Sequence, residues 1–107
     1  MLFMLQVQIA KATGMSNKEF YGIWLKEAEA AIAAIKAGAI QAMYKVPGKA
    51  EVVVIVDAAT ADDMDRMIYS LPMWKLGYAH IVTAFTWTPL RPYENWFEDL
   101  QKLAQED

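Results

Sequence analysis

Glu27 combines a residue type suited to proton transfer with an unusual place in the sequence. Residues 17–37 are predicted to form a helix, and at about 100° per residue Glu27 falls near the centre of its apolar stripe. The stripe consists of Phe20, Ile23, Trp24, Ala31, Ala34 and Ile35. A carboxylate among such neighbours loses hydration, which raises its pKa toward values useful to a general base at neutral pH. The pattern therefore predicts a catalytic role for Glu27.

The same pattern is compatible with a structural role for Glu27. The stripe could stop short of the core, so that the carboxylate reaches a rim, or the carboxylate could pair with a lysine or a backbone group. The lysines of this helix, Lys18, Lys26 and Lys36, leave it in other directions. The two interpretations differ in whether Glu27 faces an enclosed cavity or a salt bridge at its rim.

Three further side chains could assist a proton transfer. His80, the only histidine, is predicted at the start of the last strand, where it could shuttle a proton, although a lone histidine there is commonly structural. Tyr44 and Lys45 are consecutive on a strand, so they point to opposite faces of the sheet. The one on the open face could hold an anionic substrate or an oxyanion. The alternative is that Tyr44 packs in the core and Lys45 is solvated.

Tryptophan side chains could line a pocket for a flat ligand. Trp24, Trp74, Trp87 and Trp96 are the candidates, and we expect Trp24 and Trp74 to contact the substrate, although plain packing explains Trp24 equally well. The sequence predicts neither a metal nor a cofactor. His80 has no carboxylate at a ligand spacing on its own element, and the five glycines form no phosphate-binding loop.

Composition limits the class of protein and its partners. The 107 residues are predicted to form one domain, with 93–107 as a tail helix. A hydrophobic fraction of 56% is high for so small an interior and predicts an apolar cavity, a subunit interface or both. A net charge of −3 with scattered lysines argues against nucleic acid and anionic membranes as partners. The chain lacks cysteine, a membrane-spanning run and a recognisable signal sequence, so we expect a cytoplasmic protein.

Hydrophobic periodicity predicts four strands and three helices. The strands are expected at residues 2–9, 39–46, 51–57 and 79–88, and the helices at 17–37, 60–71 and 93–104. Ser16 and Glu19 form a capping box before the first helix, and Gly38 ends that helix. Pro72 is expected to stop the second helix and to lead into a loop, and Pro89 to break the chain after the last strand.

The order βαββαβ with a tail helix predicts an α+β, ferredoxin-like fold with a four-stranded antiparallel sheet. Right-handed crossovers place both helices on one face of the sheet, and the alanine-rich end of the first helix predicts a close approach to it. Met4, Gln6 and Gln8 give the other face a mixed character. Two such faces packed together make a dimeric α+β barrel with a cavity, in which Met4 and Gln6 would contact the substrate and the tail helix could clamp the neighbour.

The chain resembles the muconolactone isomerase family over most of residues 1–92. The similarity lies in the opening MLF strand, a Glu-bearing helix ending in Gly38, the hairpin from Tyr44 to Gly48, the strand ending in Asp57, and Leu71-Pro72 after the second helix. The resemblance implies that a small unsaturated lactone is isomerised by proton transfer, without metal or cofactor, in dimers that assemble into rings. It also places Glu27 at the position of a helix glutamate in the family's pattern.

Two departures from that pattern concern the substrate. Met4 stands where the family tends to carry histidine, and the hairpin has fewer arginine and aromatic residues, which leaves Lys45 and Lys49 as its nearby cations. A substrate that is more apolar and less charged than muconolactone fits this sequence better.

The sequence thus predicts a cofactor-independent, isomerase-like enzyme that acts on a small cyclic or unsaturated molecule of the lactone or enone type. Glu27 would be the general base, and Tyr44, Lys45 or His80 would stabilise the oxyanion. A related lyase or cofactor-free monooxygenase could use the same barrel. A non-catalytic module for small-ligand binding or assembly would also explain the apolar excess. The expected partners are a small apolar or weakly polar organic ligand and further copies of the chain, in a homodimer or a higher homo-oligomer.

Overall fold

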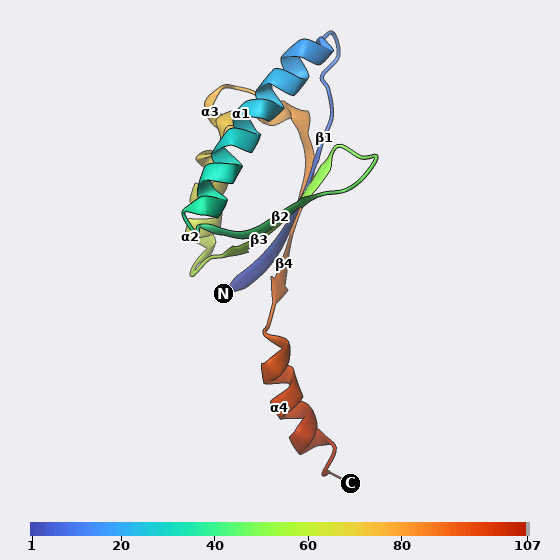
Figure 1. Ribbon diagram of the computed structural model, residues 1–107, viewed down its shortest axis with the longest axis vertical. Helices are drawn as coiled ribbons and strands as arrows, with labels where there is room; N and C mark the ends of the chain where they lie inside the picture. Colours follow the sequence, from blue (N-terminus) through green and yellow to red (C-terminus); the bar gives the residue numbers. More distant parts are fainter. Residues whose placement is uncertain (107) are drawn as a thin grey trace.

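Four antiparallel strands form one sheet in the computed structural model, which describes residues 1–106 (Figure 1). The strands are β1 (Leu2–Ile9), β2 (Ile40–Lys45), β3 (Glu51–Asp57) and β4 (Val82–Leu90), in the spatial order β2-β3-β1-β4. The helices are α1 (Asn17–Lys36), α2 (Ala61–Tyr69), α3 (Pro72–Lys75) and α4 (Tyr93–Leu103), with a 3₁₀ turn, η1 (Ala79–Ile81), before β4. This order and topology confirm the predicted α+β, ferredoxin-like fold.

The two faces of the sheet have different surroundings. Figure 1 shows α1, α2 and α3 together on one side of the sheet. Leu5, Val54 and Val56 point to that side and are buried, as alternation along the strands requires. Met4 pairs with Ile55, and Gln6 pairs with Val53, on the opposite side. No helix of the described residues covers that opposite side, which we call the bare face.

The ends of α1 follow the expected local chemistry. The Ser16 hydroxyl accepts a hydrogen bond from the backbone N–H of Glu19 at 3.1 Å, which is half of the predicted capping box. The Glu19 carboxylate accepts its hydrogen bond from the Tyr78 hydroxyl at 3.0 Å. Gly38 follows the helix with a φ of +81°, a conformation that a side chain disfavours.

The chain between α2 and β4 differs from the sequence prediction. Pro72 does follow the second helix, but it starts α3, because proline is tolerated at the first helical position, where no N–H is needed. His80 lies in η1 and precedes the last strand. Pro89 does not end β4, which continues to Leu90. A proline is compatible with β4 because β4 is an edge strand with one side unpaired.

The core consists of two clusters. One lies beneath the start of α1 and contains Ile9, Phe20, Ile23, Met73 and Ile81. The other lies beneath α2 and contains Leu5, Val54, Val56 and Ile68. Trp74 packs against both clusters, so it links them across the helix side of the sheet.

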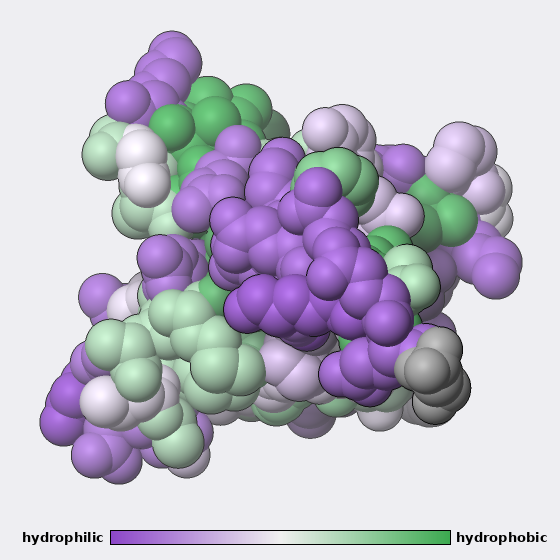
Figure 2. All heavy atoms as spheres, turned by 90° about the horizontal axis from the view of Figure 1, so that it is seen from below, coloured by the Kyte–Doolittle hydropathy of each residue, from purple (hydrophilic) through white to green (hydrophobic). Residues whose placement is uncertain are grey.

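Helix α4 projects away from the rest of the chain (Figure 1). The molecule is 63 Å long but only 27 Å and 23 Å in its other dimensions, and no residue of α4 is buried. In the view from the α4 end of the molecule, hydrophilic residues lie nearest the viewer, and hydrophobic residues are exposed around them (Figure 2). The predicted tail helix is therefore present, with its apolar side chains uncovered by its own chain.

Candidate active site

A cavity of about 550 Å³ lies between α1 and the helix side of the sheet. Its walls come from α1, from all four strands and from the segment between α2 and α3. The lining is predominantly apolar and includes Leu5, Val7, Trp24, Val54, Trp74, Phe85 and Trp87. A cavity of this volume and character suits a small organic molecule.

Alanines on α1 create this space. Ala28, Ala31 and Ala34 face the cavity where larger side chains would fill the gap between helix and sheet. The alanine-rich sequence was predicted to let the helix lie close to the sheet. Helix α1 does contact β2, and the cavity lies beside its alanines. The bulky residues Trp24 and Met73 pack in the cluster at the other half of α1.

Glu27 lines this cavity from the middle of α1. Its carboxylate is half-buried, and its Oε1 atom accepts a hydrogen bond from the backbone N–H of Met73 at 2.5 Å. Burial raises the pKa of Glu27 above its ordinary value of 4.5, and the hydrogen bond from Met73 partly opposes that rise. Among residues 1–106 Glu27 takes part in no ion pair. Glu27 thus faces a cavity, as the catalytic interpretation expected, and it has a backbone partner, as the structural interpretation expected.

The donor to Glu27 depends on the start of α3. Pro72 occupies the first helical position and has no N–H, so the N–H of Met73 is the first free donor of this helix. The side chain of Met73 is buried in the core, which fixes its backbone in place. This contact fixes one oxygen of Glu27 and leaves the carboxylate inside the apolar cavity.

Lys45 and Tyr44 lie on opposite sides of β2, as alternation predicted. Lys45 pairs with Val52, on the helix side, and lines the cavity, while its Nζ atom donates to the backbone carbonyl of Val46 at 3.1 Å. Tyr44 borders the cavity at the edge of the sheet, but it pairs with Val53 of the bare face and its side chain is 66% exposed. The interpretation of Tyr44 as a core residue is wrong, because β2 is an edge strand and its outward side chains have no cover.

The remaining candidates divide between the cavity and other surfaces. Trp24 and Trp74 line the cavity with Glu27. His80 is exposed in η1 beside the ring of Tyr78 and does not line the cavity. Met4 and Gln6 lie on the bare face, so the sheet separates them from Glu27. Any contribution of these three residues to a site stays a prediction.

Sequence reasoning missed two features of the cavity. The backbone N–H of Met73 leaves no trace in residue types, although the Leu71-Pro72 step marks a helix start. Phe85 was not singled out, although it lies two residues from Trp87 and therefore shares its face of β4. Phe85 packs its ring against that of Trp74 with centroids 6.1 Å apart.

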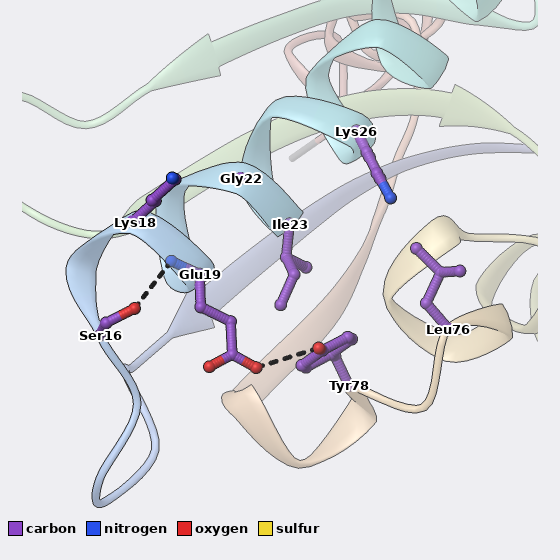
Figure 3. Close-up of a pocket in the computed structure, with 8 residues that line it drawn as sticks. All are labelled: Ser16, Lys18, Glu19, Gly22, Ile23, Lys26, Leu76 and Tyr78. Atoms are coloured by element: carbon purple, nitrogen blue, oxygen red, sulfur yellow. Dashed lines mark hydrogen bonds between the residues drawn. The ribbon is translucent and has the colours of Figure 1, made fainter.

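A second hollow lies at the start of α1 and is more open to solvent (Figure 3). Figure 3 shows Lys18 and Lys26 on the α1 side of this hollow and the Glu19–Tyr78 hydrogen bond across it. That hydrogen bond to the Glu19 carboxylate, together with its charge, raises the pKa of the Tyr78 phenol. Because both of these polar groups already satisfy each other at the surface, the cavity at Glu27 is the stronger candidate for chemistry.

The described part of the chain contains neither a metal-binding cluster nor a membrane-spanning helix. Residues 1–106 hold no cluster of three or more histidine, aspartate or glutamate side chains that could bind a metal ion. Within the same residues, no helix has the length and apolar character needed to cross a bilayer.

The sequence of residues 1–95 matches that of a known family. The family is described as muconolactone delta-isomerase, and the match covers β1 through the first residues of α4. No curated protein sequence is similar enough to be a match.

Proposed function

Because the chain belongs to the muconolactone delta-isomerase family, we propose that it is an isomerase that moves a proton on a small cyclic or unsaturated molecule of the lactone or enone type. Glu27 is the general base in this proposal, and no cofactor takes part. The observation that carries the proposal is the half-buried Glu27 carboxylate, which faces an apolar cavity of about 550 Å³ and has no ion-pair partner among residues 1–106.

The proposed reaction moves one proton and one double bond. The Glu27 carboxylate takes a proton from the carbon between the carbonyl and the double bond of a β,γ-unsaturated lactone, and the electron pair of the broken C–H bond is delocalised onto the carbonyl oxygen. The Glu27 carboxyl group then returns the proton to the γ-carbon, so that the double bond becomes conjugated with the carbonyl. Atoms and charge balance without a co-reactant. A raised pKa helps the first step, because it makes the carboxylate a stronger base.

The lining of the cavity supports a neutral substrate with an apolar body. Glu27 is the only carboxylate among the described lining residues, and Lys45, at the edge of the sheet, is the only lysine or arginine. A substrate carbonyl that points toward Lys45 would have a cation near the oxygen where negative charge develops. Aromatic walls from Trp24, Trp74 and Trp87 suit a flat ring.

The first prediction tests whether ligands bind in this cavity. Ala31→Trp should fill the space opposite the sheet and weaken the binding of a neutral β,γ-unsaturated γ-lactone at least about tenfold, because the indole ring and the ligand cannot occupy the same volume. Ligand binding is measured by equilibrium dialysis. The far-ultraviolet circular dichroism should keep its wild-type shape, since a half-open cavity accommodates the added ring.

Ala33→Trp is the matched control for this experiment. Ala33 is exposed and lies two residues along α1, on the side away from the cavity, so the same substitution adds an indole ring without entering the space. Binding should be unchanged in this variant. Equal binding by wild type, Ala31→Trp and Ala33→Trp would place the ligand elsewhere and remove the basis of the proposal.

The second prediction concerns assembly through the bare face. Met4, Val53 and Ile55 are only half-buried there, and covering them with the same face of another copy would remove apolar surface from water. We expect light scattering at low micromolar concentration to give at least twice the chain mass of 12.1 kDa. A folded monomer under these conditions would rule out a stable barrel-type dimer.

A further inference from the structure

Helix α1 has a second apolar face that residues 1–106 leave largely exposed. Besides the residues that face the sheet, α1 carries Tyr21, Leu25, Ala28, Ile32 and Ile35, spaced alternately four and three residues apart. We call these residues the outer stripe. Tyr21 and Leu25 are each 59% exposed and Ile32 is 54% exposed. A 4-3 spacing of this kind is the pattern by which one helix packs along another.

The outer stripe borders the mouth of the cavity. Ala28, Ile32 and Ile35 belong to the stripe and also line the cavity. Four large hydrophobic residues of the cavity lining are exposed. Three of them, Ile32, Ile35 and Tyr44, lie along the seam between α1 and β2, and the fourth, Phe85, lies on β4. The cavity therefore opens mainly along this seam, and an element lying on the outer stripe would close it.

Helix α4 has the matching features. Its apolar side chains recur at similar spacings along one face, and they are Tyr93, Trp96, Phe97, Leu100 and Leu103. All five are exposed in their own chain, and α4 points away from the sheet and the other helices (Figure 1). The family match ends at residue 95, so most of this helix lies outside the matched residues.

The two surfaces agree in length and in charge. At about 1.5 Å per residue, the outer stripe is about 21 Å long and the apolar face of α4 about 15 Å, so the stripe can accommodate the whole face. Glu94 and Glu98 lie on one flank of α4 and have no ion-pair partner within residues 1–106. Lys18 and Lys36 flank the two ends of the outer stripe, and Glu29 lies between them on the same side of α1. The two glutamates of α4 could thus meet a lysine at one end of the stripe, which favours this pairing over a random apolar contact.

We propose that α4 of a second copy of the chain lies on the outer stripe and closes the mouth of the cavity. The cavity is then complete only in the dimer, and the neighbour's aromatic residues form its outer wall. This inference rests on the proposed function in taking the cavity as the reaction site. Closing the seam excludes bulk water from Glu27, which strengthens the electrostatic interactions of the reacting groups. Substrate entry and product release then require α4 to lift, as a lid does.

Cross-linking between defined positions tests the contact, because the chain has no cysteine of its own. We expect the double variant Ile32→Cys/Phe97→Cys, treated with a short bis-maleimide, to give a covalent dimer on a denaturing gel. The matched control is Lys26→Cys/Phe97→Cys. Lys26 is exposed on the flank of α1 remote from the outer stripe, so its thiol should remain without a bridge to residue 97. Circular dichroism checks that both variants are folded.

The other outcomes overturn the inference. A cross-linked species of monomer mass would mean that α4 folds back onto its own chain, and the absence of any bridge would mean that α4 lies elsewhere or meets a different protein. Equal cross-linking of the Lys26 control would mean that α4 has no defined place on α1. None of these results depends on turnover, so failure of the lid and failure of Glu27 as a base are detected separately.

Discussion

Glu27→Gln should lower the rate of double-bond migration about 10²- to 10⁴-fold, the usual contribution of a positioned general base. The amide keeps the size of the side chain, and its oxygen can still accept the hydrogen bond from Met73. What it loses is the capacity to take up a proton at neutral pH. The reaction is followed by the ultraviolet absorbance of the conjugated product.

Glu29→Gln provides the matched control, because it makes the same chemical change two residues along the same helix. Glu29 is exposed on the outer side of α1 and lines neither cavity nor hollow. Its substitution should leave the rate within about twofold of wild type, as expected for a surface change away from the site. Ligand binding by wild type without formation of the conjugated product would favour a non-catalytic binding module over an isomerase, and an unchanged rate in Glu27→Gln would exclude Glu27 as the base.

The same variant predicts a pH-dependent change in stability, whose sign follows from the raised pKa. A carboxyl group whose folded-state pKa lies above its unfolded value holds its proton more tightly in the fold. Its contribution to stability is therefore fully present below the unfolded pKa and is lost as the pH rises through the folded value. Burial raises the pKa of Glu27 above 4.5, so wild type should lose stability over this range and Glu27→Gln should not.

Thermal melts at pH 4 and pH 8 measure this difference. The melting temperature of Glu27→Gln relative to wild type should be higher at pH 8 than at pH 4. Lys45 shares the cavity, and Lys26 and Lys36 lie elsewhere on α1; all three are present in both proteins, so the comparison isolates the change at residue 27. A variant that is markedly less stable at pH 8 and still active would identify Glu27 as a structural acceptor for Met73.

Much of the fold could be predicted because its signals are local. The alternation of Leu5 and Val7 with Met4 and Gln6 fixes which side of β1 is buried, and the Ser16 cap fixes where α1 begins. The errors arose where a local rule depends on tertiary position. Pro89 is read as a strand breaker by propensity alone, and only its place on an edge strand makes it acceptable.

Glu27 could be singled out from the sequence, but the cavity that it lines could not. Glu27 stands out because a charge on an apolar stripe violates the helical pattern. The cavity was expected between two bare sheet faces, next to Met4 and Gln6, whereas the one that Glu27 lines is on the helix side. The volume of such a cavity is the volume between α1 and the sheet minus the volume of the side chains that extend into it. No periodicity encodes this difference, which here depends on alanines such as Ala31 facing distant tryptophans such as Trp87.

Replacing the apolar face of α4 should weaken self-association at least about 100-fold. In Phe97→Asp/Leu100→Asp, two large side chains can no longer be buried against a neighbour, and each such burial is worth about 1.5–3 kcal/mol. Their combined loss, about 3 kcal/mol or more, corresponds to a factor of at least about 100 in the dissociation constant. Sedimentation velocity over a dilution series measures this shift. Contacts through the bare face should persist, so a weaker dimer is expected at high concentration.

Gln101→Asp/Gln105→Asp is the control that separates apolar contact from charge. Gln101 lies on the polar flank of α4 that carries Glu94 and Glu98, and Gln105 lies just after the helix, so the same two negative charges are added away from the apolar face. Opposite the lysines of α1 these charges should leave association unchanged or strengthen it. No residue of α4 is buried in its own chain, so neither variant should unfold the sheet or the other helices. The far-ultraviolet spectrum of the monomer should therefore change at most by the contribution of α4 itself. If Phe97→Asp/Leu100→Asp kept the wild-type dissociation constant, α4 would have no part in holding the copies together, and the neighbour could not supply the missing wall of the cavity.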